Sequence, residues 1–579
     1  MKITLKSLAI LFACSCCFGM SNKITHDFKQ KPELQILPKG SPLAENVDLV
    51  DLRNCSPETK LAAITLQGKV NSGEKSRVFM LVYKDKEADE RAHTKMDFWL
   101  DYFKQKNHIK NYKQIDLDTY FAKYKDAYSK VIVCDPNLEA SINVATMMCS
   151  LDDAIVISKS DLDKFSDGKE VIHLSGRWKK NVDAYKWAYE NLWDKMNHKM
   201  LSCQHPTYAE HHLRDYLIRH KIFQFWVTGA NVQDNPEADS EAELKFARKL
   251  MSKMPPCAPL VGWLDGGEDD IGLTEYGGVG IAGEYGMITL GTNWGANYSA
   301  LSGISVDFAS MIKRYQAKKD YSVPKLEDDK VYLSFVIQDS GDAPAYWQAI
   351  QAEVWKDENR GKLPIGWGIT VSSLEMSAPM VEWFYDNAKA NDYFYFCISG
   401  AGYCHPYRDF CSKTKNPEQA WDRYFTIIDE YAEFTGIEEL GLYTDAWLEF
   451  DRKENDPVTK KFVNSLENID TFILGLGRDK NIVKQGHNYL LGQEDSLVSH
   501  VVTRWDTKNT YPNKENQQWL ANEIRKHTPK KRPAFIMVHP LSWSYFPTDL
   551  LKVTEMLGNE YQAISPRIFR DLYLKSIDK

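Results

Sequence analysis

The 579-residue sequence lacks several features that would assign it to a specialised class of protein. No apolar run in it reaches the roughly 20 residues that a membrane-spanning helix needs. It has no excess of positive charge, because 72 Lys and Arg are outnumbered by 80 Asp and Glu, for a net charge of −8. We therefore expect no nucleic-acid partner. Hydrophobic residues make up 43% and charged residues 26%, which excludes disordered and collagen-like classes.

Local motifs for metal and nucleotide chemistry are also scarce. The eight cysteines after residue 21 form no C-x-x-C, and the 14 histidines include no pair spaced by three to five residues. Walker A and G-x-S-x-G motifs are absent as well. Residues 278–283 match G-x-G-x-x-G, but a strand-like run at 287–290 follows, which disfavours nucleotide binding. We expect no cofactor and no bound metal.

The amino terminus has the layout of an export signal. Lys2 and Lys6 precede an apolar run at 8–13, and a segment rich in small residues and cysteine follows at 14–21. This pattern predicts a signal peptide over residues 1–21 and a protein exported to the periplasm, the cell surface or the medium. Residues 11–14 also approximate a bacterial lipoprotein signal, so a lipid anchor at Cys14 is an alternative outcome of export.

Two cysteines are close enough in sequence to form a disulfide in an oxidising compartment. Cys404 and Cys411 are separated by six residues. A disulfide between them is one interpretation, and buried free thiols scattered through the core are the other.

The length predicts two domains. In residues 22–326 strand and helix patterns alternate, which favours a parallel, Rossmann-like α/β domain. The polar, Pro-containing stretch 318–330 is the best linker candidate, so the second domain is placed at 327–579. In the first domain, strand patterns lie at 77–83, 131–134 and 154–157, and helical patterns lie at 90–103 and 139–150.

The second domain repeats one unit, a strand followed by a helical pattern. Eight such units in about 250 residues predict a (β/α)8 barrel or a distorted relative, and a flat doubly wound sheet is the alternative. The eight strand candidates are 331–337, 363–370, 393–398, 440–443, 472–476, 497–503, 534–538 and 561–564.

Parallel strands place an active site at their carboxyl ends, so the residues after each strand are the candidates for chemistry. Hydrolysis of a glycosidic bond needs a carboxylic acid for the leaving oxygen and a carboxylate as nucleophile or base. Asp339 and Asp445 are the favoured pair, with Glu375 or Asp342 as substitute partner. A helix cap or loop position is the alternative interpretation of each.

Aromatic residues, histidines and two glycines after the strands are candidates for substrate binding. Tyr, Trp and His side chains can stack on sugar rings or bond their hydroxyls, and the 12% aromatic content suits this function as well as it suits a large core. The candidates are Gly400, Gly402, Tyr403, His405, Trp447, Trp505 and His539.

The segment Gly400-Ala401-Gly402-Tyr403-Cys404-His405-Pro406 resembles the signature of the GxGYxYP family, which is grouped with the glycoside hydrolases. The order of neighbouring motifs matches too, from Gly262-Trp263 and Asn297-Tyr298-Ser299 to Val538-His539, so the resemblance covers most of the chain. His405 stands where the signature has its second Tyr. The resemblance implies an exported protein of bacterial polysaccharide-utilisation systems.

The sequence therefore predicts an exported glycoside hydrolase that acts on a poly- or oligosaccharide. One alternative is a glycan-binding protein without catalysis, in which Tyr403, Trp447 and Trp505 are stacking platforms. Another is a metal-dependent carbohydrate deacetylase, in which Asp339 would be a ligand. Nothing in the sequence sets an oligomeric state.

Overall fold

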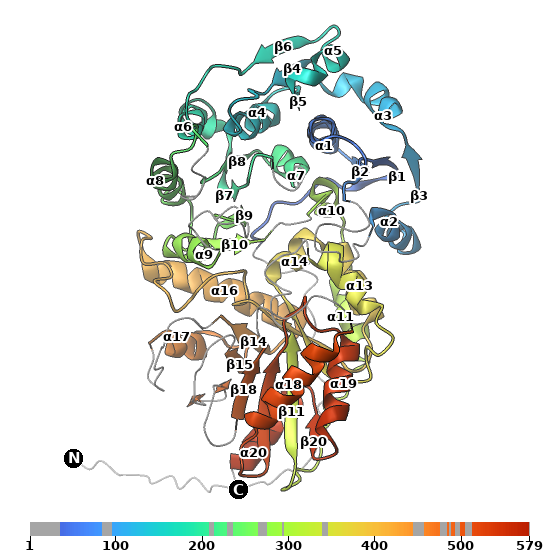
Figure 1. The fold of residues 1–579 in the computed structure, drawn as a ribbon, viewed down its shortest axis with the longest axis vertical. Coiled ribbons are helices and arrows are strands. Elements are labelled where there is room, and N and C mark those ends of the chain that lie inside the picture. The colour runs from blue at the N-terminus through green and yellow to red at the C-terminus, as the bar shows by residue number, and fades with distance from the viewer. Residues whose placement is uncertain are drawn as a thin grey trace, which may run out of the picture.

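The protein is built from four mainly parallel β-sheets, three in the amino-terminal half and one in the carboxyl-terminal half (Figure 1). The computed structural model describes residues 35–577, apart from 84–94, 208–212, 229–234, 265–274, 292–294, 338–345, 444–456, 475–482, 486–487, 492–497 and 504–511. The expected signal peptide lies outside the described residues. No helix in the part that the structure describes is long and apolar enough to cross a membrane.

The first sheet has the strand order β2-β1-β3, and all its strands are parallel. Its long helix α1 begins where the sequence favours a helix start, because the Ser56 side chain accepts a hydrogen bond from the Thr59 N–H at 3.3 Å and Pro57 is the first helical residue. The elements are β1 (Leu43–Asp51), α1 (Pro57–Asn71), β2 (Ser76–Leu81), α2 (Met96–Gln105), β3 (Asn111–Ile115) and α3 (Leu117–Lys123).

The second sheet has the order β5-β4-β6 and is also parallel. The edge strand β5 and the central strand β4 after its first residue consist of fully buried Val, Ile and Ala residues, as expected of strands covered on both faces. The elements are β4 (Lys130–Val133), α4 (Ala140–Leu151), β5 (Ala154–Ile157), α5 (Leu162–Phe165), β6 (Glu170–His173) and α6 (Asn181–Leu192).

The third sheet has the parallel order β10-β9-β7-β8. The G-x-G-x-x-G segment lies inside α9, and β10 follows it, so the expected strand after this segment is confirmed. The elements are β7 (Asn197–Cys203), α7 (Arg214–Arg219), β8 (Ile222–Phe225), α8 (Ser240–Met251), β9 (Pro259–Gly262), α9 (Glu275–Glu284), β10 (Ile288–Leu290), α10 (Tyr298–Leu301) and α11 (Phe308–Gln316).

The predicted parallel α/β architecture of this half is confirmed, but its strands are distributed over three small sheets. β2 belongs to the first sheet, whereas β4 and β5 belong to the second. Each sheet has only three or four strands, so each depends on helices and on its neighbours to cover its faces.

The fourth sheet contains all eight strands predicted for the carboxyl-terminal half. Their pairings are parallel, and two further strands, β16 and β17, form an antiparallel hairpin. The strands are β11 (Val331–Ile337), β12 (Ile365–Ile369), β13 (Asp392–Phe396), β14 (Glu439–Leu442), β15 (Thr471–Leu474), β16 (Val483–Gln485), β17 (Asn488–Leu491), β18 (Val498–Val502), β19 (Ala534–His539) and β20 (Tyr561–Ala563).

Helices connect most of these strands, as the repeat predicts. The connection from β15 to β18 differs, since its described residues form the β16–β17 hairpin. The helices are η5 (Trp347–Gln351), α13 (Ala352–Trp355), α14 (Val371–Met376), α15 (Ala378–Asn387), α16 (Pro417–Thr435), α17 (Pro457–Ser465), α18 (Lys514–Lys526), α19 (Pro547–Leu557) and α20 (Pro566–Ile577).

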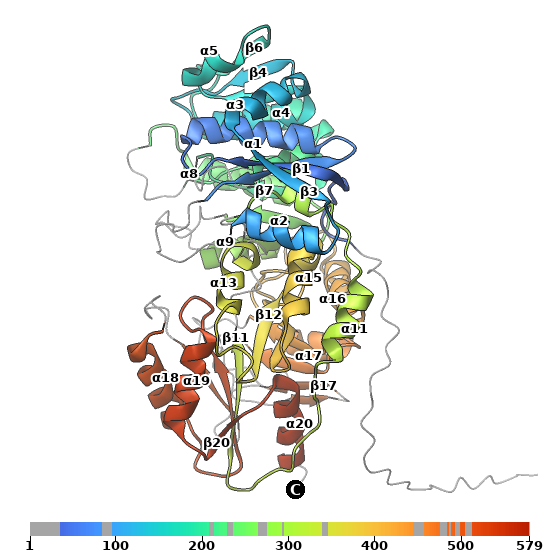
Figure 2. The same ribbon diagram turned by 90° about the vertical axis from the view of Figure 1, so that its right-hand side faces the viewer.

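The order β16-β17-β15-β14-β13-β12-β11-β19-β18 resembles that of a (β/α) barrel, but in a barrel β20 would lie between β19 and β11. Here β11 pairs directly with β19 and has β20 on its other edge. A closed barrel would also pair the two ends of this order. No such pairing occurs among the described residues, so the sheet is a curled half-barrel, the distorted relative of the predicted (β/α)8 barrel. Figure 2 shows this sheet below the amino-terminal half.

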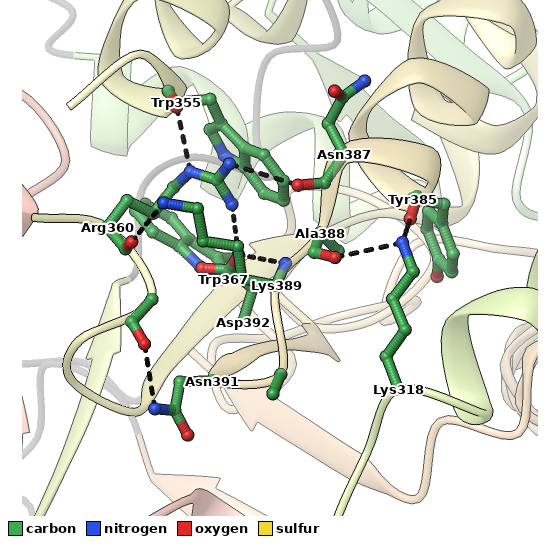
Figure 3. A network of polar contacts seen from close by, with 12 residues as sticks. Lys318, Trp355, Arg360, Trp367, Tyr385, Asn387, Ala388, Lys389, Asn391 and Asp392 are labelled. Carbon is green, nitrogen blue, oxygen red and sulfur yellow. Dashed lines mark hydrogen bonds and ion pairs between the residues drawn. The ribbon is translucent and has the colours of Figure 1, made fainter. Parts of the chain in front are cut away.

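A buried ion pair fixes the amino-terminal end of β13 (Figure 3). The carboxylate of Asp392 pairs with the guanidinium of Arg360 and accepts hydrogen bonds from the Trp367 indole N–H at 3.1 Å and the Lys389 backbone N–H at 2.8 Å. Arg360 also stacks on Trp355, 4.2 Å from its ring centre. These contacts tie β12 to β13 at the end opposite the GxGYxYP-like segment.

Candidate active site

The GxGYxYP-like segment follows β13 and needs glycine at two positions. Gly400 has a φ of +83°, and a Cβ there would lie 2.8 Å from the Ile428 side chain. A Cβ on Gly402 would lie 2.0 Å from the Cγ2 atom of Ile288 in β10. Gly400 therefore supplies a left-handed backbone angle, and Gly402 allows the close approach of the segment to β10.

The same segment joins the fourth sheet to the third. The backbone of Tyr403 donates to and accepts from the backbone of Thr289 in β10, both at 3.0 Å, which makes an isolated antiparallel bridge. Beyond it, the Cys411 N–H donates to the carbonyl of Gly283 in α9 at 2.8 Å. The third sheet is therefore part of the surroundings of the candidate site.

Ser399 positions the start of the segment against β14. Its N–H donates to the Gly441 carbonyl at 2.8 Å, and its Oγ donates to the Cys404 carbonyl at 3.2 Å. The same Oγ accepts the N–H of Tyr443 at 3.2 Å. Tyr443, directly after β14, is thereby held beside the segment.

Five ring side chains meet at this junction, and we call them the aromatic cluster: Trp263, Tyr276, Tyr403, His405 and Tyr443. Tyr403 makes an edge contact with Trp263 at 6.1 Å between ring centres, and His405 lies 4.2 Å from Tyr276 and 4.7 Å from Tyr443. Trp263 follows β9, Tyr276 lies in α9, and the other three follow β13 or β14. Carboxyl ends of strands from two sheets therefore converge on one cluster.

The hydrogen bond of His405 defines its tautomer. Its Nε2 lies 3.2 Å from the backbone carbonyl oxygen of Tyr276. A carbonyl oxygen can only accept, so Nε2 carries the hydrogen. Burial lowers the pKa of His405 to about 3, so the ring is neutral and Nδ1 is a hydrogen-bond acceptor.

His539 is the last residue of β19, at the same edge of the sheet. Its side chain is buried, and its backbone carbonyl accepts a hydrogen bond from the Thr503 N–H at 3.2 Å. The parallel order of the strands places the ends of β11, β13, β14 and β19 on one edge, and the Tyr395 hydroxyl in β13 donates to the Ile337 carbonyl at the end of β11 at 3.0 Å.

Five predicted residues lie outside the described residues: Asp339, Asp342, Asp445, Trp447 and Trp505. In the chain, Asp339 comes two residues after the end of β11 and Asp445 three residues after the end of β14. Their predicted roles stay predictions.

Glu375 lies in α14, and its carboxylate is buried among hydrogen-bond donors. It accepts from the Ile36 N–H at 3.0 Å, from the Leu37 N–H at 2.6 Å and from the Tyr431 hydroxyl. Burial raises its pKa to about 7. None of these contacts is to the aromatic cluster, so the structure does not bring Glu375 together with Tyr403 and His405.

Sequence reasoning did not single out Tyr276, Thr289 or Tyr443, and it noted Trp263 only within the family resemblance. A usable signal was present, because Trp263 follows a strand and Tyr443 follows another, as the other candidates do. The strand-end rule holds for the third sheet as well, because the carboxyl end of β9 reaches the same place as those of β13 and β14.

Cysteines and metal ligands give no further centre in the part of the chain that the structure describes. No group of three or more His, Cys, Asp and Glu side chains there could hold a metal ion. Cys404 and Cys411 are free, buried thiols rather than a disulfide. Burial raises the pKa of Cys404 to about 12, and its Sγ lies 3.5 Å from the Tyr424 hydroxyl.

The fold and the site define a multidomain α/β protein with a candidate site between a half-barrel and a smaller parallel sheet. Four sequence models of one family match the chain in order, described as "GxGYxYP_N 1st domain" (46–126), "GxGYxYP_N second domain" (128–196), "GxGYxYP third domain" (198–303) and "GxGYxYP putative glycoside hydrolase C-terminal domain" (329–574). The chain therefore belongs to the GxGYxYP family, as its signature segment predicts. The four matched ranges coincide with the four sheets.

One solved structure has the same fold over nearly the whole chain. It is the crystal structure of "a putative hydrolase from Bacteroides thetaiotaomicron VPI-5482", determined at 1.25 Å resolution. The two chains share 20% identity with a TM-score of 0.70, over 93% of this chain and 96% of that one. No curated protein matches the chain.

Proposed function

We propose that the protein is an exported glycoside hydrolase that cleaves a poly- or oligosaccharide. The observation that carries the proposal is the aromatic cluster at the carboxyl ends of the strands, with Asp339 and Asp445 following two of the same strands in the chain. Aromatic rings present apolar faces to sugar rings, while carboxyl groups supply the proton and the nucleophile or base. Membership of the family supports this reaction class.

Asp339 and Asp445 act as the acid and its partner. One protonates the leaving oxygen, and the other attacks the sugar or activates water. A separation of about 5 Å between the two carboxyl groups gives retention of configuration, and roughly 6.5–9.5 Å gives inversion. Asp342 is the substitute partner, since it follows the same strand as Asp339. The Glu375 carboxylate, in contrast, already accepts hydrogen bonds from three donors outside the aromatic cluster.

Export rests on the amino-terminal sequence. The basic residues, the apolar run and the small-residue segment are those of a cleaved signal. Mass spectrometry of the protein from the envelope of its native host tests this point. Loss of about 20 residues supports a cleaved signal, a lipid on Cys14 supports the anchored form, and an intact Met1 contradicts export.

The test of the proposed activity is a screen of the full-length protein on plant and host glycans that records product release and binding in parallel. Product release from at least one glycan supports the proposal. Binding without product across the panel would favour a second candidate, a glycan-binding protein that uses the same aromatic cluster, with Trp447 and Trp505 as further platforms. Neither binding nor product would contradict both.

A further inference from the structure

We propose that His405 and Thr289 form a subsite that binds an uncharged hydrogen-bond donor of the glycan, a hydroxyl or an N-acetyl amide N–H. The inference rests on the proposed function and adds to it a residue of the third domain and the charge class of the group that is recognised. Two independent observations carry it, one on each residue.

The first observation is that Nδ1 of His405 is a buried acceptor without a donor. The side chain is 2% exposed, and Nδ1 has no hydrogen-bond partner among the described residues. Because the Tyr276 carbonyl takes the hydrogen on Nε2, Nδ1 presents a lone pair. A lone pair attracts O–H and N–H groups and repels a carboxylate.

The second observation is that Oγ1 of Thr289 is also buried without a partner in the described part of the chain. Thr289 and Tyr403 exchange both backbone hydrogen bonds, and residues directly opposite in an antiparallel pair place their side chains on the same face. The Thr289 side chain therefore lies on the same face as that of Tyr403, a member of the aromatic cluster. Buried polar atoms are nearly always satisfied, so two unsatisfied atoms flanking one ring favour a ligand that supplies the partners.

The charge around this subsite keeps His405 neutral, so the lone pair of its Nδ1 stays available to a donor. The ring neighbours of His405 are Tyr276, Tyr403 and Tyr443, which are uncharged at neutral pH. The nearby cation is Arg408, whose guanidinium lies 5.1 Å from the centre of the Tyr276 ring and further disfavours the imidazolium form of His405. His405 therefore stays neutral across the physiological range.

Tyr276 is the member of the cluster nearest the surface, being only partly buried. Its ring covers His405, while its backbone carbonyl, not its side chain, holds Nε2. A sugar that reaches His405 must displace this ring, and the displacement leaves the carbonyl and the tautomer unchanged. Tyr276→Ala separates these two roles, because it removes the ring and keeps the carbonyl.

The first experiment measures the tautomer in the full-length protein by ¹⁵N NMR with labelled histidine, assigned with His405→Phe. We expect an Nε2–H tautomer with a bare Nδ1 from pH 5 to pH 8, in the wild type and in Tyr276→Ala. Protonation of His405 within this range would overturn the proposal, whether or not the protein hydrolyses glycans.

The second experiment measures binding of a panel of neutral, N-acetylated and uronic-acid oligosaccharides. We expect Thr289→Val and His405→Phe each to weaken binding of neutral or N-acetylated members by about tenfold, and Thr289→Ser to retain it. The melting temperature of Thr289→Val should equal or exceed that of the wild type, because its hydroxyl has no partner to lose; a purely structural hydroxyl would lower it.

The outcomes separate the subsite from the proposed function. Hydrolysis with KM and kcat unchanged in Thr289→Val and His405→Phe overturns the subsite and leaves the glycosidase assignment intact. Preferential binding of uronic acids that depends on His405 overturns the charge class. Absence of binding and turnover across the panel overturns both proposals.

Discussion

The backbone of Tyr403, in the loop after β13, forms two hydrogen bonds of 3.0 Å with the backbone of Thr289 in β10. This bridge adds the family's signature segment to the edge of the third sheet. A segment that belongs to the half-barrel by sequence is thus completed by another domain, which brings Trp263 and Tyr276 to the same cluster.

The bridge depends on Gly402. We expect Gly402→Ala to lower the free energy of unfolding by about 1–3 kcal/mol or more and to reduce glycan binding, since the added Cβ would lie 2.0 Å from Ile288 in β10. Urea denaturation measures the loss. The double variant Gly402→Ala/Ile288→Ala should lose less than the two single changes added together.

Gly73→Ala is the matched control for this substitution. The nearest atom to a Cβ there is 3.5 Å away, and the backbone is not in the left-handed region. A change within about 0.5 kcal/mol is expected for it. Equal losses in Gly402→Ala and Gly73→Ala would show that the approach of Ile288 is not the cause.

Glu375 links residues 36–37 to the half-barrel, and this link is expected to depend on pH. Burial raises the pKa of Glu375 to about 7 in the folded protein, whereas the unfolded chain loses this proton near 4.5. Between these values the folded state binds more protons, so the contribution to stability is fully present below about pH 4.5 and is lost as pH rises toward 7. The slope approaches about 1.4 kcal/mol per pH unit.

Glu375→Gln removes this titration. The difference in unfolding free energy between wild type and variant should change between pH 4.5 and 7 and stay constant above pH 8. Hydrogen exchange gives a second measurement, because the Ile36 and Leu37 N–H groups lose an acceptor in the variant and should exchange faster. A difference that is flat across the whole pH range would contradict the raised pKa.

Asp392 and Arg360 form a buried ion pair at the opposite end of β13 (Figure 3). Asp392→Asn leaves the Arg360 charge without its partner in a buried place and should cost about 3–5 kcal/mol by urea denaturation. Arg360→Met/Asp392→Asn should recover part of that loss. Glu555→Gln breaks the exposed pair with Lys552 and should cost less than about 1 kcal/mol, and a comparable cost in both sites would argue against burial as the cause.

Most of the half-barrel was predictable because its strands are continuous apolar runs at regular spacing. Val331–Ile337 and Ala534–His539 are buried along their whole length, the pattern of strands covered on both faces. The β16–β17 hairpin was not predictable because its strands have only three and four residues, and the open edges of the sheet were not because they depend on pairing between distant segments. The division of the first half into three sheets was not predictable either, because the sequences of β2 and β4 each indicate a strand but not the sheet to which the strand belongs.

The candidate site was predictable only in part. Tyr403 and His405 are found together, as the strand-end rule indicates, and Tyr443 follows a strand that was also predicted. The role of Glu375 as a link to residues 36–37 could not be read from the sequence, because its partners are backbone N–H groups about 340 positions away. Trp263 and Thr289 reach the site through the contact between two sheets, which no local pattern encodes.

The roles of Asp339 and Asp445 give the last prediction. Asp339→Asn and Asp445→Asn should each leave the melting temperature within a few degrees of the wild type and lower product release by at least a hundredfold, because each keeps the shape of the side chain and removes a group that must ionise or give a proton. Asp329→Asn, an exposed position before β11, is the control and should retain full activity. Binding of the glycan should persist in all three variants, since the aromatic cluster is untouched. Product release that survives both replacements would mean that other carboxylates perform the hydrolysis, and Asp342→Asn is then the variant to compare.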